Sequence, residues 1–174
     1  MTLSSTTIFI ILFTPIITIA QKSQQQWLVN KFKNADSVIL ISHELVQGST
    51  DVEGDSNGKI IPFPKLIIRH RLNPNILTEY RPINSQEVDS LLAILMRPDL
   101  DLTKIQGGCF VSRQAIILIK NNRTSYIDIC FHCSSYETSK DLQNIPSFDK
   151  RRWEELEDFF KSHGLKYKLD DLPD

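Results

Sequence analysis

The chain has 174 residues and a formal net charge of -1, with 41% hydrophobic and 24% charged residues. This length and composition suit one globular domain with its own hydrophobic core. Because acidic and basic residues nearly cancel, the overall charge does not point to a nucleic-acid-binding protein or to one held on an anionic membrane by its net charge.

The N-terminus carries an apolar run over residues 8–19. The run is shorter than the roughly 20 apolar residues of a membrane-spanning helix. It has the length of the apolar part of a signal peptide, and the small residues Thr18 and Ala20 suit cleavage after Ala20. We therefore predict a signal peptide over 1–20 and an exported mature chain over 21–174, periplasmic or secreted and without a transmembrane span. An uncleaved anchor and a buried helix of a cytosolic protein are the alternatives.

The first half of the mature chain alternates between apolar strands and polar connections. Spaced apolar residues predict a short amphipathic helix, and β-branched runs predict strands. Residues 49–59 are polar and contain two glycines, which is typical of an exposed loop, and their acidic residues do not follow the pattern of a calcium-binding loop. In chain order we expect a helix over 24–34, a strand over 37–46, this loop, and strands over 65–71 and 77–83.

The second half contains two longer helices and one hairpin. Asn84 and Glu87 form a capping-box pattern at the start of a helix. Residues 115–119 are continuously apolar, 126–131 alternate, and Asn121-Asn122 suits a two-residue hairpin turn between them. A last helix is expected after a Ser147 cap, and Gly164 is expected to end it. Its apolar stripe consists of Trp153, Leu156, Phe159 and Phe160. A short strand over residues 165–169 is expected to follow. The fold class is α+β, a single domain with a largely antiparallel sheet and two or three packed helices.

All three cysteines, Cys109, Cys130 and Cys133, lie in and around this hairpin. With a two-residue turn, Lys120 pairs with Arg123 and Cys130 faces Arg113. Since faces alternate along a strand, one side then carries the candidate site residues and the other carries the packing residues Ile127, Ile129 and Phe131. The candidate side consists of Cys109, Arg113, Asp128, Cys130 and His132. A three-residue turn would instead place Cys109 diagonal to Cys133, so both registers gather the thiols at one end of the hairpin.

Four interpretations of the cysteines follow. A structural disulfide that joins Cys109 to Cys130 or Cys133 closes the open end of the hairpin, as expected in an oxidising compartment. A redox-active Cys130-Cys133 pair would use the facing Arg113 to lower the pKa of the attacking thiol. A soft-metal site would combine the thiolates with a histidine, His132 or His70 from the strand over 65–71. Inert core thiols are the fourth possibility.

The residues Cys109, Arg113 and Ile129-Cys130-Phe131-His132-Cys133 resemble a pattern in uncharacterised exported bacterial proteins, C-x-x-P-R-H followed by a hairpin with I-C-F-x-C. The similarity covers about 25 residues, and this chain has Ser112 in place of the proline and Gln114 in place of the histidine. The resemblance implies an exported protein and no particular reaction.

These observations favour a small exported protein that acts as a binding or envelope accessory module with a structural cysteine cluster. The alternative is a thiol redox or soft-metal-binding protein that uses Cys109, Cys130 and Cys133. The sequence contains none of the common hydrolase or phosphate-loop motifs. It predicts no cofactor, no resident metal and no nucleic-acid partner, and it leaves the partner unknown.

Overall fold

The computed structural model describes residues 26–46, 63–98, 110–143, 145 and 147–169. The predicted signal peptide, the polar loop over 49–59 and Cys109 lie outside these described residues. None of the helices in the described part has both the length and the apolar character needed to cross a membrane.

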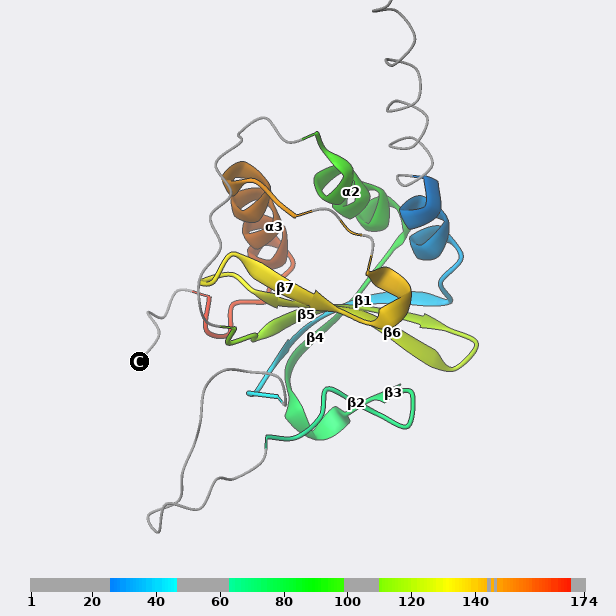
Figure 1. The fold of residues 1–174 in the computed structure, drawn as a ribbon, viewed down its shortest axis with the longest axis vertical. Coiled ribbons are helices and arrows are strands. Elements are labelled where there is room, and N and C mark those ends of the chain that lie inside the picture. The colour runs from blue at the N-terminus through cyan, green and yellow to red at the C-terminus, as the bar shows by residue number, and fades with distance from the viewer. Residues whose placement is uncertain (1–25, 47–62, 99–109, 144, 146, 170–174) are drawn as a thin grey trace, which may run out of the picture.

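An antiparallel sheet with the strand order β4-β1-β5-β6-β7 organises the fold (Figure 1). The two central strands, β1 and β5, are almost entirely buried because both faces of the sheet are covered. The result is the α+β arrangement that the sequence predicts, in a single compact unit. The strands are β1 (Ser37–His43), β4 (Leu77–Ile83), β5 (Gln114–Lys120), β6 (Arg123–Cys130) and β7 (Ser135–Thr138).

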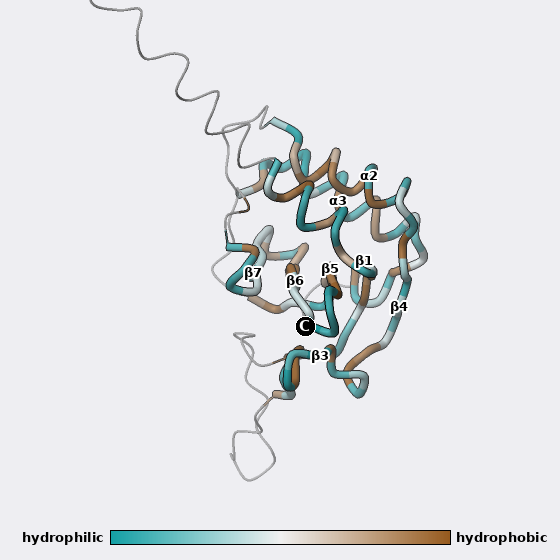
Figure 2. Tube along the Cα trace, turned by 90° about the vertical axis from the view of Figure 1, so that its right-hand side faces the viewer, coloured by the Kyte–Doolittle hydropathy of each residue, from teal (hydrophilic) through white to brown (hydrophobic). Residues whose placement is uncertain are grey.

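Three helices cover one face of this sheet, and a small hairpin covers the other (Figures 1 and 2). The helices lie over residues 26–33, α2 (Ser85–Met96) and α3 (Lys150–Ser162). Alternate strand residues separate into two cores: Leu40, Ile116 and Ile127 face the helices, while Ile39, Ile41 and Ile117 face the hairpin. The hairpin side consists of β2 (Ile67–Ile68), β3 (Arg71–Leu72) and the 3-10 turn η1 (Pro74–Ile76), and a second 3-10 turn, η2 (Lys140–Leu142), follows β7.

The helix boundaries follow from local hydrogen bonds. The predicted capping box of α2 is confirmed, since Asn84 accepts from the Glu87 amide and the Glu87 side chain accepts from the Asn84 amide. The predicted Ser147 cap of α3 is wrong. Asp149 caps this helix instead, because its carboxylate accepts the Arg152 amide at 2.8 Å. Gly164 follows the helix with φ at 85°, which confirms its role as the stop.

The predicted register of the central hairpin is confirmed. Lys120 pairs with Arg123 across a two-residue turn, and Asn121 and Asn122 adopt φ angles of 48° and 62°. Asparagine tolerates this left-handed conformation better than most residues. The register places Ile127 and Ile129 in the helix-side core, as expected, and Asp128 on the opposite face.

Two predicted strands are corrected. Residues 65–71 do not form one strand, because the chain reverses at Arg69 and His70, whose φ angles are 50° and 67°. A left-handed conformation costs a residue such as arginine about 1 to 2 kcal/mol, so neither apolar pattern nor turn propensity indicated this reversal. Residues 165–169 form no strand: residues 167–169 are a turn, and the Lys166 and Tyr167 amides donate to the Glu79 carboxylate at 2.9 and 3.0 Å.

Candidate functional site

The cysteines do not pair as the hairpin argument expected. Cys130 and Cys133 form a disulfide, with their Cα atoms 5.2 Å apart. Cys130 is the last residue of β6 and pairs with Ser135 at the start of β7, so the chain turns back within the intervening loop. This unpredicted hairpin brings Cys133 to Cys130 and makes a local bridge across the β6–β7 loop.

The disulfide loop is anchored from inside the protein. Cys130 and Cys133 are only 1% and 3% exposed. Phe131 packs edge-on against Trp153 and Phe160 of α3, with ring centroids 6.3 and 5.5 Å away. His132 is the exposed residue of the four-residue motif. The bridge therefore holds a loop whose phenylalanine belongs to the helix-side core.

Arg113 immediately precedes β5, where its amide donates to the Ile129 carbonyl at 3.3 Å, and its side chain contacts Glu44 and Tyr167. Its Nη1 contacts Oε2 of Glu44 at 3.3 Å, and its guanidinium lies 6.0 Å from the centre of the Tyr167 ring. The Tyr167 hydroxyl donates to Oε1 of Glu44 at 2.9 Å. Burial first, and then this hydrogen bond to Glu44, raise the pKa of Tyr167. Arg113 thus helps to hold the chain after α3 against β1, and the oxidised Cys130 offers it no thiolate to stabilise.

A buried polar cluster lies on the hairpin side of the sheet. His43 at the end of β1 contacts Asp128 of β6, with Nε2 and Oδ1 3.0 Å apart. The Ser112 hydroxyl donates to Oδ2 of the same carboxylate at 2.9 Å. His43 and Ser112 are fully buried, and Asp128 is 4% exposed. We call His43, Asp128 and Ser112 the buried polar cluster.

Both ring nitrogens of His43 have a hydrogen-bonding partner. The His43 Nδ1 atom lies 2.7 Å from the Glu44 carbonyl oxygen, which can only accept, so Nδ1 carries a proton. The other ring nitrogen, Nε2, lies 3.0 Å from Oδ1 of Asp128 and shares a hydrogen bond with it. Burial first, and then the Asp128 carboxylate, raise the pKa of Glu137, which pairs with Asp128 across β6 and β7. Both ring nitrogens of His43 and both carboxylate oxygens of Asp128 thus have hydrogen-bonding partners within the protein.

The same geometry argues against catalysis by this cluster. A serine nucleophile requires a base within hydrogen-bonding reach of its hydroxyl, but Ser112 donates to Asp128 and not to His43. All three side chains are also closed to solvent. The network is therefore suited to fixing β1 against β6, and we assign it a structural role.

The sequence interpretation singled out Asp128 but missed its partners. His43 follows Ile39 and Ile41 at alternate positions of an apolar strand, so it shares their buried face. A polar residue at such a position needs a buried partner. Asp128 is a polar residue on the same face of β6, level with Ile41 across Ala115 of β5. Matching one polar residue on each of two buried strand faces is the signal that would have indicated the pair.

The described residues contain no group of three or more His, Cys, Asp or Glu side chains arranged to hold a metal ion. His70 and His132 do not approach the bridge as ligands; His70 lies at the β2–β3 turn, where its carbonyl accepts the Thr124 amide at 3.0 Å. No protein-family model matches the chain, and neither does any curated protein or solved structure.

Proposed function

We propose that the chain is an exported accessory protein of the cell envelope or its surroundings, in which the Cys130–Cys133 disulfide is structural. The observation that carries the proposal is this buried disulfide in a small α+β domain. Disulfides persist in oxidising compartments and are kept reduced in the cytosol. The apolar N-terminal run and the resemblance to exported bacterial proteins point to the same compartment.

The contribution of the bridge to stability is modest. Its loop spans only three residues of sequence separation, and the chain-entropy relation gives about 2 kcal/mol for so short a loop. Its local effect is larger than this number suggests, because the loop carries Phe131 into contact with α3. The bridge serves to fix the β6–β7 loop rather than to close the whole hairpin.

A thiol redox function is the second candidate, and one contact favours it. The Cys133 amide donates to Sγ of Cys130 at 3.2 Å, and such a hydrogen bond would stabilise a Cys130 thiolate after reduction. Thiol–disulfide exchange, however, requires an incoming thiolate to reach a sulfur atom. Both cysteines are almost completely buried, so the structural role is favoured.

Export predicts that the mature protein begins at Gln21. The reason is that Thr18 and Ala20 form the small-residue junction directly after the apolar run. N-terminal sequencing of the full chain, expressed in its native host and recovered from the fractionated envelope and medium, measures this directly. A protein that retains Met1 in the cytosolic fraction would contradict the proposal.

A further inference from the structure

We infer that one end of the molecule docks on an anionic phospholipid surface. This names a partner for the envelope role proposed above and so rests on it. The end is formed by the tips of two hairpins and by η2, and it is defined by Arg69, Arg71, Arg123 and Lys140. We call these four residues the basic end.

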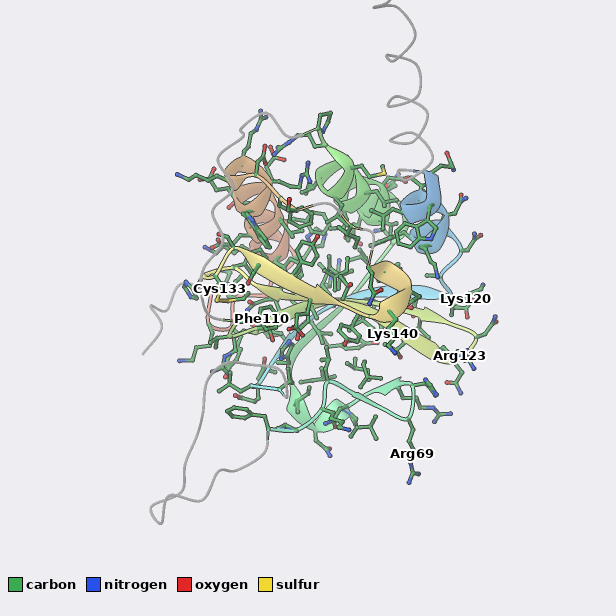
Figure 3. All side chains as sticks on the ribbon, in the orientation of Figure 1. Arg69, Phe110, Lys120, Arg123, Cys133 and Lys140 are labelled. Atoms are coloured by element: carbon green, nitrogen blue, oxygen red, sulfur yellow. A yellow bond between two sulfur atoms is a disulfide. The ribbon has the colours of Figure 1, made fainter. Side chains whose placement is uncertain are left out.

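The four cations gather although they come from three separate segments. The Thr124 amide donates to the His70 carbonyl at 3.0 Å, which holds the β2–β3 turn against the start of β6. Ser125 donates to Asp141 at 2.7 Å, which holds η2 against the same strand. In Figure 3, Arg69 lies at the lower tip of the protein, Arg123 and Lys120 lie at the right, and Lys140 lies between them and the middle of the view, whereas Cys133 and Phe110 lie at the left.

The basic end carries positive charge that no carboxylate of the described residues neutralises through an ion pair. All four side chains belong to exposed residues. Two carboxylates are already engaged by other cations: Asp36 binds Lys120 at 2.8 Å, and Asp141 binds Lys31 at 3.1 Å. A local excess of cations therefore exists on a chain whose net charge is only -1.

One cation of the basic end, Arg69, is held in an unfavourable backbone conformation. Both hairpin turns require positive φ at two residues, and the β5–β6 turn uses the tolerant pair Asn121-Asn122. The β2–β3 turn places Arg69 in the same conformation, which is unfavourable for arginine. Strained residues kept in this way are concentrated at functional positions.

An exposed apolar side chain at the same tip favours a lipid surface over a soluble polyanion. Ile68 precedes Arg69 and pairs with Arg71, and it is 47% exposed. An apolar residue between basic residues can enter the headgroup region while the cations bind lipid phosphates. A soluble polyanion would use the cations alone.

The test is binding of the purified mature protein to sedimented vesicles at about 0.1 M salt, where charges are screened over about 10 Å. Vesicles of phosphatidylethanolamine with phosphatidylglycerol are compared with vesicles of neutral phosphatidylcholine. We expect binding to the anionic vesicles only. The triple variant Arg71→Gln, Arg123→Gln and Lys140→Gln should weaken it about 100-fold, because each basic residue near an anionic surface contributes about 1 kcal/mol, or about fivefold.

The matched control removes three exposed cations elsewhere, through Lys150→Gln, Arg151→Gln and Lys166→Gln. It changes the net charge equally and should retain binding to within about fivefold. Ile68→Ser should weaken vesicle binding without changing retention on immobilised dextran sulfate. Arg69→Asn should weaken binding while raising the thermal midpoint, because it relieves the turn and removes one charge.

Equal losses in the triple variant and its control would overturn the proposal, as would absence of binding to anionic vesicles. Binding to dextran sulfate or to a nucleic acid but not to vesicles would also overturn it, since the partner would then be a soluble polyanion. Because the assay uses purified protein, a negative result here leaves the N-terminal sequencing result independent, so failure of docking and failure of export are distinguishable.

Discussion

Trp153→Ala is expected to lower the free energy of unfolding by about 3 to 5 kcal/mol, the range for deleting a large buried aromatic side chain. Trp153 lies on α3, is 6% exposed, and meets the rings of Phe131, Tyr136 and Phe148 at centroid distances of 6.3, 6.2 and 5.0 Å. Its removal would leave a cavity between α3 and the disulfide loop. Equilibrium denaturation in urea, followed by circular dichroism, measures the change.

Tyr80→Ala is the matched control for this experiment. Tyr80 is an aromatic residue on the edge strand β4 and is 54% exposed. Its truncation should change stability by no more than about 0.5 kcal/mol, as for most surface substitutions. A Trp153 variant within about 1 kcal/mol of the wild type would show that the aromatic cluster does not anchor α3 to the sheet.

Asp128→Ala should destabilise the protein by about 3 to 5 kcal/mol, because it removes one partner of a buried histidine–carboxylate pair. The substitution leaves His43 Nε2 and the Ser112 hydroxyl without the acceptor they now share, and both residues are fully buried. Denaturant unfolding at neutral pH gives the magnitude.

Asp128→Asn separates lost hydrogen bonding from lost packing. Its amide oxygen can accept from Ser112 and its amide nitrogen can donate to neutral His43, so the loss should be only about 1 kcal/mol. If the alanine and asparagine variants were equally stable, the buried polar cluster would not contribute through its hydrogen bonds.

Local patterns in the sequence were sufficient for most of the fold. The Asn84–Glu87 capping box, the Asn121-Asn122 turn and the apolar stripe of α3 each depend on residues close together in the chain, and each is confirmed. The β2–β3 hairpin was missed because Arg69 is a poor residue for its turn. The strand expected over 165–169 was wrong because the Glu79 side chain, not a neighbouring strand, binds its amides.

The candidate site was less predictable because it depends on contacts between distant segments. The sequence identified the cysteines and the register of β5 against β6, which runs from Gln114–Ile129 to Lys120–Arg123. It did not contain a clear turn signal for the β6–β7 hairpin that brings Cys133 back. Arg113 contacts Glu44 and Tyr167, which are distant in the sequence and approach it only in the folded protein. His43 and Asp128 are 85 residues apart, and their pairing also requires that β1 and β6 flank β5 in the sheet.

The state of Cys130 and Cys133 in the living native host is the most direct measurement of whether the bridge is a structural element of an exported protein. Cells are quenched in acid, free thiols are alkylated, and the peptide that carries both residues is analysed by mass spectrometry. The expected result is an intramolecular disulfide in essentially every copy, with no alkyl group on either sulfur. A fully alkylated pair would place the protein in a reducing compartment, and a mixture of alkylated and oxidised peptide would identify a cycling redox centre; either result contradicts the structural role.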